Sequence, residues 1–243
     1  MRVAVVSDIH SNLAALQAVV ADFGQVDEVW CLGDVIGYGP EPNECVALVR
    51  QLPRLACVAG NHDWAGVGKL PLDDFNEHAR EAAAWTAGQL TAVARAFIVG
   101  LPTRLERGGC TLVHGSPREP VTEYLLRTWR AAECFRDFAT QTCFVGHSHV
   151  PLIFQETPTG SGARYVDPDY DAPLQLGQAR RIVNPGSVGQ PRDGNPDASY
   201  ALLDPESGQL QFRRVPYDVA ATQARMRAAG LPNQLWQRLT YGL

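Results

Sequence analysis

The sequence predicts an α/β fold with a two-sheet core and helices on the outside. Its first half alternates short apolar runs with segments of helical spacing, whereas its second half is mostly strand-like until Asp218. Several apolar runs are continuous, as expected when both faces of a sheet are covered. Neither an internal repeat nor an interdomain linker is visible in the 243 residues, so we expect one domain spanning residues 1–243.

The expected strands are short runs rich in β-branched and aromatic residues, bounded by turn residues. A Pro-, Gly- and Asp-rich stretch, Thr157–Gln178, indicates a hairpin excursion or a mobile loop. We expect strands at Val3–Ser7, Glu28–Leu32, Leu55–Ala59, Thr111–Val113, Thr142–Val145, Leu152–Gln155, Arg181–Val183, Tyr200–Leu203 and Gln209–Val215.

The expected helices have apolar residues at helical spacing between these strands. Leu13–Phe23 shows this spacing most clearly, and Pro42–Leu52 follows the second strand. Asp73 or Asp74 is expected to cap a long helix that reaches about Val99 and is stopped by Gly100 and Pro102. Further helices are expected at Val121–Ala139 and after Asp218.

Charge and composition exclude several classes of protein. The net charge of −5 comes without a basic stripe, which disfavours a nucleic acid as partner. The amino-terminal segment lacks the pattern of a signal peptide, and no apolar stretch approaches the roughly 20 residues that span a bilayer. We therefore expect a soluble cytoplasmic protein without a membrane partner. The six cysteines form no CxxC pair, which favours buried reduced thiols over disulfides or metal ligands.

Five of the six histidines lie in short motifs at or just past the ends of expected strands. Ligands bind at the carboxyl ends of strands in α/β sheets, so these side chains are expected to meet at one edge. Carboxylate, amide and imidazole donors together suit Mn, Fe, Zn, Co or Ni. The motifs are Asp8-Ile9-His10, Gly33-Asp34, Gly60-Asn61-His62-Asp63, His114-Gly115 and Gly146-His147-Ser148-His149.

Local geometry adds two expectations about these motifs. Asp8 and His10 are two residues apart, so on an extended segment their side chains would lie on the same side and reach one ion. The glycines of the motifs remove Cβ bulk where the backbone turns sharply and approaches the site. These glycines are Gly33, Gly60, Gly115 and Gly146.

In this order, the motifs resemble the calcineurin-like metallophosphoesterase superfamily, from Arg2 to about Tyr217. The segments Gly33–Pro40, His114–Pro117 and Asn184–Gly189 resemble a compact bacterial and archaeal branch of it. The resemblance implies a four-layer α/β/β/α sandwich with two mixed β-sheets and a dinuclear metal centre, for which we favour manganese. It places Asp8, His10 and His149 on one metal, Asn61, His114 and His147 on the other, and Asp34 between both.

The resemblance also implies the chemistry. His62 would not bind metal but would give a proton or contact phosphate, with Asp63 either orienting its ring or satisfying backbone donors. Attack by a metal-bridging hydroxide would transfer the phosphoryl group directly to water. Protein serine/threonine phosphatases of this superfamily have Asp-Arg-Gly after Gly-Asp and Gly-Asn-His-Glu, whereas this chain has Val35-Ile36-Gly37 and Asp63, which argues against that activity.

The leading prediction is a phosphohydrolase that cleaves small phosphodiesters or nucleotides. The alternatives are a phosphomonoesterase, including a nucleotide or dinucleoside-polyphosphate hydrolase, and a weakly catalytic metal-bearing scaffold protein. A homo-oligomer stays open as an alternative to a monomer. Weaker candidates for substrate contacts are Arg192, Tyr38, Arg118 and Tyr124, each of which also fits a packing or solvated role.

Overall fold

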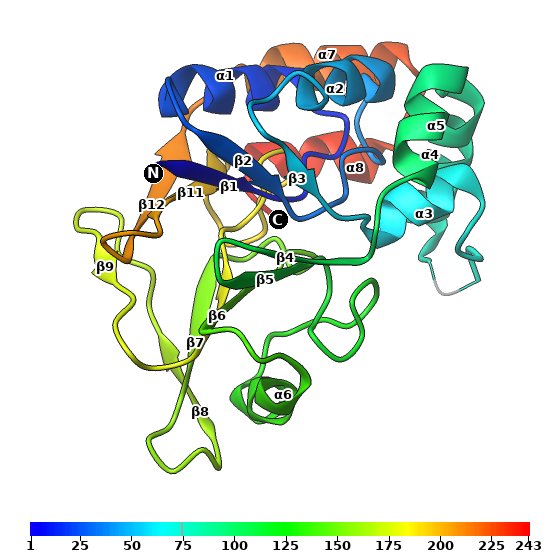
Figure 1. Ribbon diagram of the computed structural model, residues 1–243. Coiled ribbons are helices and arrows are strands. Elements are labelled where there is room, and N and C mark those ends of the chain that lie inside the picture. The colour runs from blue at the N-terminus through cyan, green and yellow to red at the C-terminus, as the bar shows by residue number, and fades with distance from the viewer. Residues whose placement is uncertain (74) are drawn as a thin grey trace.

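The computed structural model describes residues 1–73 and 75–243, and these form two mixed six-stranded sheets that pack face to face (Figure 1). This confirms the predicted α/β class and its layering. The first sheet has the order β3 (Ala56–Cys57), β2 (Glu28–Cys31), β1 (Val3–Val6), β11 (Ala198–Asp204), β12 (Gln209–Val215), β9 (Leu174–Gln175). The second has the order β4 (Arg104–Arg107), β5 (Cys110–Val113), β6 (Thr142–Phe144), β10 (Arg181–Asn184), β7 (Leu152–Glu156), β8 (Ala163–Val166).

Each sheet contains a run of parallel strands. In the first sheet β1, β2 and β3 are parallel, and in the second β5, β6 and β10 are parallel. The other pairings are antiparallel. The parallel runs matter for function because the carboxyl ends of parallel strands share one edge of a sheet.

Successive side chains of β1 point to opposite faces of the first sheet, and both faces are packed. Val3 and Val5 belong to the core between the sheets, which also contains Trp30, Phe144 and Phe212. Ala4 and Val6 face the opposite way, as the two-residue period of a strand requires, and pack beneath helices. Both faces are therefore buried, which explains the continuously apolar sequence of this strand.

Helices cover the outer faces of both sheets. α1 (Leu13–Phe23), α2 (Pro42–Val49) and α5 (Ala92–Val99) contribute to the outer core of the first sheet. α6 (Thr128–Cys134) and the 3₁₀ turn Phe135–Asp137 cover the second. A smaller apolar cluster joins Tyr38 to α4 (Glu77–Gln89), α7 (Val219–Ala228), α8 (Asn233–Gln237) and the 3₁₀ turn Arg238–Thr240.

A buried carboxylate ties the two sheets together at the amino end of β2. The Glu28 side chain is 3% exposed and accepts hydrogen bonds from Trp30 Nε1 at 3.1 Å and Arg107 Nε at 2.9 Å. Arg54 pairs with its other oxygen at 2.9 Å. Because Arg107 lies on β4, this network links the first sheet to the second.

Two predicted helices differ from the structure. The long third helix is divided into α4 and α5, because Leu90 is extended and Thr91 starts a new helix as its N-cap. Asn76 caps α4 by accepting from Ala79 N at 2.9 Å, so the prediction for Asp73 is wrong, and Asp74 lies outside the described residues. Residues 121–127, expected to begin a helix, instead belong to the turn that follows His114.

Sequence patterns also missed short elements. α3 (Asn61–Val67) starts inside the Gly60-Asn61-His62-Asp63 motif, where no helix was predicted. β4 and β9 are short, partly exposed strands that were also not predicted. β8 pairs antiparallel with β7, so the hairpin that was one of the two expectations for Thr157–Gln178 is present. All six cysteines are buried and unpaired within the described chain, as expected, and no helix in the described ranges is long and apolar enough for a membrane span.

Candidate metal centre

The motif residues lie in the turns that follow five parallel strands. Asp8 and His10 follow β1, Asp34 follows β2, and Asn61 follows β3 in the first sheet. His114 follows β5, and His147 and His149 follow β6 in the second. The structure brings these seven side chains into two overlapping buried clusters, so the expectation that they meet at one edge is confirmed.

The turns that carry these residues are strained, and one expectation about them is wrong. Asp8 and His10 do not lie on an extended segment, because both have positive φ, at 53° and 49°. Asp34, His147 and His149 also have positive φ, between 52° and 64°. Non-glycine residues in this region cost about 1–3 kcal/mol each and persist where the surrounding structure over-determines them. Asp8 and His10 therefore reach one point because the chain turns, not because the strand continues.

Glycines permit the close approach of these turns. A Cβ on Gly60 would stand 2.1 Å from Asp34 Oδ1, and a Cβ on Gly146 would stand 2.0 Å from Ser7 Oγ. Both distances are far below a van der Waals contact, so any larger residue would displace the turns. The predicted reason for these two glycines is confirmed.

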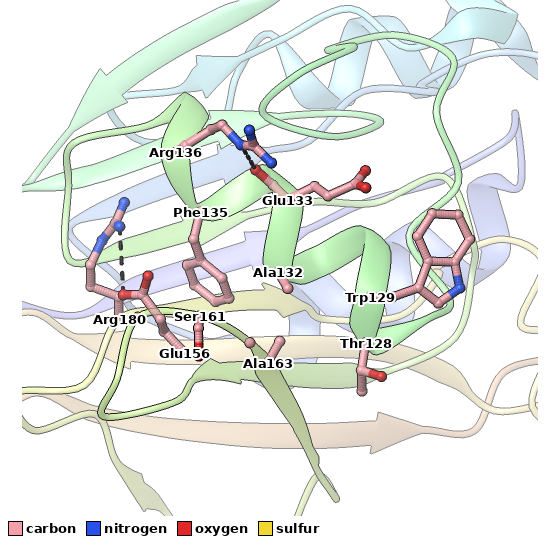
Figure 2. A pocket seen from close by; sticks show the side chains of 12 residues that line it. Thr128, Trp129, Ala132, Glu133, Phe135, Arg136, Glu156, Ser161, Ala163 and Arg180 are labelled. Atoms are coloured by element: carbon pink, nitrogen blue, oxygen red, sulfur yellow. Dashed lines mark hydrogen bonds and ion pairs between the residues drawn. The ribbon is translucent and has the colours of Figure 1, made fainter.

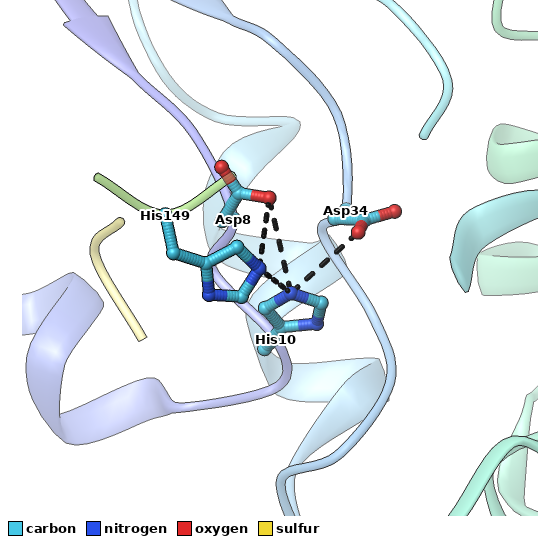
Figure 3. Close-up of side chains that lie close together, drawn as sticks. All are labelled: Asp8, His10, Asp34 and His149. Atoms are coloured by element: carbon cyan, nitrogen blue, oxygen red, sulfur yellow. Dashed lines mark hydrogen bonds and ion pairs between the residues drawn. The ribbon is translucent and has the colours of Figure 1, made fainter. Parts of the chain in front are cut away.

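The first cluster consists of Asp8, His10, Asp34 and His149 (Figure 3). His10 Nε2 lies 3.0 Å from His149 Nε2 and 3.5 Å from Asp34 Oδ2, and His149 Nε2 lies 3.3 Å from Asp8 Oδ1. All four residues are buried. The three elements that supply them are the turns after β1, β2 and β6, so both sheets contribute.

The second cluster consists of Asp34, Asn61, His114 and His147. His114 Nε2 lies 3.1 Å from Asn61 Oδ1, 3.2 Å from His147 Nδ1 and 3.3 Å from Asp34 Oδ2. Asp34 Oδ2 therefore faces both clusters, while its Oδ1 accepts the backbone N–H of His62 at 2.8 Å. This buried Oδ2 has no hydrogen-bond partner among the described residues.

Hydrogen bonds outside the clusters fix which ring nitrogen points inward as an acceptor. His114 Nδ1 donates to Leu32 O at 2.8 Å, His147 Nε2 to Thr122 O at 3.0 Å, and His149 Nδ1 to Gln190 O at 2.6 Å. A carbonyl oxygen can only accept, so each neutral ring turns a lone pair toward the cluster. When all three rings are neutral, their lone pairs converge with carboxylate oxygens and an amide oxygen, which is the environment a cation satisfies.

Burial is the largest influence on the ionisable groups of both clusters. It lowers the pKa of His10 and His149 well below the ordinary value, and it lowers that of His147 to about 3 together with the positive charge of His114. Burial also lowers the pKa of His114, but the charge and hydrogen bond of Asp34 overcome this and raise it to about 9. The centre therefore favours positive charge beside Asp34, where a divalent cation would replace the proton.

His62 and Asp63 occupy the first turn of α3, beside the clusters. The His62 ring lies 5.0 Å from the His10 ring and packs between Tyr38 and Phe75, at 4.2 and 5.0 Å between centroids. Burial lowers its pKa to about 4, and its Nδ1 has no hydrogen-bond partner in the described part of the chain. Asp63 accepts the backbone N–H groups of Gly60 and Ile36 at 3.0 and 3.2 Å, so its contacts hold the start of α3.

The four weaker candidates lie in different surroundings. Tyr38 is buried against the rings of His10 and His62, and Arg192 lies over its ring at 5.8 Å. Tyr124 is 47% exposed and stacks on His147, with 3.7 Å between centroids. Arg118 pairs with Glu123 and Glu133, so its charge is already compensated.

The residues that brace the centre from outside were not singled out from the sequence. Ser187 Oγ donates to Asp8 O at 2.8 Å, and Gln190 O accepts from His149. Asn184 Nδ2 donates to Gly146 O at 2.6 Å and to Ser148 Oγ at 3.0 Å. The segment Asn184–Gly189 stood out by its resemblance, but only the structure shows that it holds the turns after β1 and β6.

Two pockets differ in whether their lining residues contact the clusters. Figure 2 shows a groove between α6 and the β7–β8 hairpin, lined by Trp129, Phe135 and Arg180 among others. None of the described cluster residues lines it. A smaller cavity of about 330 Å³ is lined by Tyr38, whose ring also contacts His10 and His62, but by none of the described cluster residues.

Comparisons with known proteins agree with this geometry. The sequence pattern described as "Calcineurin-like phosphoesterase superfamily domain" matches residues 1–208. An uncharacterized protein from Methanocaldococcus jannaschii is 37% identical over 256 residues, covering 99% of this chain and 98% of its own length.

Solved structures are similar over the whole chain. A metallophosphoesterase from Sphaerobacter thermophilus is 49% identical, with a TM-score of 0.92 and coverage of 100% of this chain and 99% of its own. A hypothetical protein from Pyrococcus horikoshii shares the fold at 22% identity, with a TM-score of 0.80 and coverage of 100% and 98%.

Proposed function

Because this chain belongs to the calcineurin-like phosphoesterase superfamily, as its motifs predicted, we propose that it is a dinuclear metal-dependent phosphohydrolase acting on small phosphodiesters or nucleotides. We also propose that residues 1–243 form one functional domain. The observation that carries the proposal is the convergence of two acceptor sets on Asp34 Oδ2, which faces His10 Nε2 at 3.5 Å and His114 Nε2 at 3.3 Å. A structural site for one ion would need only one such set.

The donors fit two divalent transition metals. Asp8, His10 and His149 would hold one cation, and Asn61, His114 and His147 would hold the other, with Asp34 shared. The mixed nitrogen and oxygen donors suit Mn, Fe, Zn, Co or Ni, and we favour Mn²⁺. When bound, the pair supplies Lewis acidity, which activates water and neutralises charge on phosphoryl oxygens.

The protein's own residues orient the ester and supply the proton. His62 would protonate the leaving oxygen, because its ring stands beside the first cluster and does not belong to either acceptor set. Burial lowers the pKa of His62 and so disfavours its protonated form. The negative charge of a bound phosphate ester would raise this pKa and favour the protonated ring. Asp63 is a positioning residue in this scheme, since it holds the backbone turn that presents His62 and Asn61.

Two alternatives use the same centre. A phosphomonoesterase would need further positive charge for a dianionic group, and Arg192 beside Tyr38 is the observation that keeps this reading open. A weakly catalytic scaffold would bind the same metals without needing His62. The buried ring of His62, placed beside the first cluster without a partner for Nδ1 in the described residues, supports an enzyme instead.

Metal analysis combined with turnover tests the proposal. The purified protein is expected to hold about two equivalents of transition metal per chain and to hydrolyse bis(p-nitrophenyl) phosphate when Mn²⁺ is added. Hydrolysis of p-nitrophenyl phosphate instead would favour the monoesterase. Full metal content with no turnover of either ester would favour the scaffold, and failure to take up metal after reconstitution would refute the dinuclear centre.

A further inference from the structure

The turn between His114 and α6 contacts the ring of His147 on two sides. Thr122 O accepts the N–H of His147 Nε2 at 3.0 Å, and the Tyr124 ring stacks on its face with 3.7 Å between centroids. On the inner side, His147 Nδ1 lies 3.2 Å from His114 Nε2. One ligand of the second cluster is therefore held by the two residues that flank Glu123.

Glu123 is a buried carboxylate that ties this turn to α6. Its side chain is only 8% exposed. Its Oε2 accepts from Ser116 Oγ at 2.6 Å and from Arg118 Nε at 3.2 Å, both within the turn. Its Oε1 accepts from Arg118 Nη2 and, at 3.1 Å, from Arg130 Nη1, which lies on α6. Charge-assisted hydrogen bonds of this kind are roughly twice as strong as neutral ones, so the carboxylate fixes the turn firmly.

The backbone of the turn is too closely packed for Glu123 to move alone. A Cβ on Gly115 would stand 2.9 Å from Glu123 N and 3.0 Å from Thr122 N. Glu123 also shares its peptide groups with Thr122 on one side and Tyr124 on the other. A displacement of Glu123 would therefore shift the carbonyl and the aromatic ring that hold His147.

The first cluster is supported by a different segment of the chain. His149 Nδ1 donates to Gln190 O at 2.6 Å. Ser187 Oγ accepts from Gln190 N at 2.8 Å and donates to Asp8 O at 2.8 Å. These contacts come from the segment that follows β10, whereas those on His147 come from the turn that follows β5. A change at Glu123 should therefore reach one cluster only.

We propose that Glu123 is a positioning residue that sets the affinity of the second cluster for its cation, through His147 and without touching the cation. The inference rests on the proposed dinuclear centre. It also gives Arg118 and Tyr124 a role in supporting the centre, where the sequence offered them as substrate contacts. Partners of metal ligands typically contribute about 10- to 100-fold to metal affinity.

Equilibrium dialysis of the Mn²⁺-loaded protein against buffers of fixed free Mn²⁺, followed by elemental analysis, tests this role without turnover. Glu123→Gln keeps the size of the side chain. Because both carboxylate oxygens face an arginine N–H, either orientation of the amide sets an NH₂ group against a donor. The wild-type chain should bind two cations. In Glu123→Gln one of them should bind roughly 10- to 100-fold more weakly, and the other should stay within about 3-fold.

A second substitution identifies the cation that is affected. Asn61→Ala removes a donor of the second cluster, and His10→Ala removes one of the first. Adding Glu123→Gln should weaken the remaining cation by roughly 10- to 100-fold in His10→Ala and by less than about 3-fold in Asn61→Ala. Tyr124→Ala tests the same support at a side chain that is 47% exposed, and it should weaken the same cation even if Glu123→Gln does not fold.

Asp22→Asn is the matched control. Asp22 on α1 also accepts from a hydroxyl, that of Tyr200 at 2.6 Å, and from an arginine, Arg213 Nη2 at 3.1 Å, but it lies in the outer layer. This variant should bind both cations as the wild type does. Equal weakening of both cations in Glu123→Gln, or of neither, would overturn the inference. A wild-type chain that binds fewer than two cations would refute the dinuclear centre and the inference with it, whereas selective loss without hydrolysis of any ester would sustain the inference and refute the proposed hydrolase.

Discussion

Asp34 is the residue through which the dinuclear proposal can be tested most directly. Its Oδ2 faces one acceptor set through His10 and the other through His114, at 3.5 and 3.3 Å. Asp34→Asn keeps the size of the side chain and removes the negative charge from both sets at once. The variant should therefore lose affinity for both cations rather than for one.

The expected magnitude follows from ligand linkage. At a free cation concentration of about 1,000 times Kd, one cation adds about 4 kcal/mol to the free energy of unfolding, so two add about 8 kcal/mol. This corresponds to a rise in Tm of roughly 15–30 °C for a protein of this size. A loss of about 100-fold in affinity per cation removes about 2.7 kcal/mol for each. Asp34→Asn should then retain a cation-dependent gain of only about 3 kcal/mol.

Urea unfolding with and without Mn²⁺, paired with elemental analysis, measures this gain. Glu28→Gln is the control, because Glu28 is also a buried carboxylate but lies at the opposite end of β2. It should lower stability equally with and without Mn²⁺ and leave the gain intact. If Asp34→Asn loses only about 2.7 kcal/mol of the gain, Asp34 serves a single cation. An unchanged gain would refute its role as a shared ligand.

Three further outcomes follow from the same contacts. His62→Asn should keep both metals and lose about 10²- to 10⁴-fold in turnover of alkyl esters, with a smaller loss for p-nitrophenyl esters; loss of metal would contradict its assignment. Glu28→Gln should lower the free energy of unfolding by about 1–3 kcal/mol at pH 7. Hydrogen bonds from Arg107 lower the pKa of Glu28, so this difference should shrink as pH falls below about 4, and a pH-independent difference would count against it. Gly60→Ala should reduce metal content, because its Cβ would meet Asp34 Oδ1 at 2.1 Å, and full occupancy would show that the turn can move.

The position of the metal centre could be predicted because it depends on strand order. Each motif follows an apolar run, and the carboxyl ends of parallel strands share an edge. Asp8, Asp34 and Asn61 follow β1, β2 and β3 in this way. The alternation of apolar runs and helical patterns was sufficient to place them without any knowledge of the turns between.

The conformation of the turns could not be predicted, because distant residues impose it. Asp8 N donates to Gly33 O at 3.1 Å and His10 N donates to Asp34 O at 2.9 Å, contacts that exist only after β1 and β2 pair. The expected extended segment was wrong for this reason. Ser187 was missed for a similar reason, since nothing near it in the sequence shows that its hydroxyl donates to Asp8 O.

The centre also joins the two sheets, and this links metal binding to folding. Each cluster draws on both sheets: His149 of the second sheet meets Asp8 and His10 of the first, and His114 of the second meets Asn61 of the first. Glu28 and Arg107 join the sheets at the amino end of β2 through an ion pair that needs no metal. Metal binding at the carboxyl ends of the parallel strands therefore also stabilises the packing of the two sheets. Removing the metals with a chelator should loosen the sheets at these ends first, while the Glu28–Arg107 contact holds them together at the amino end of β2.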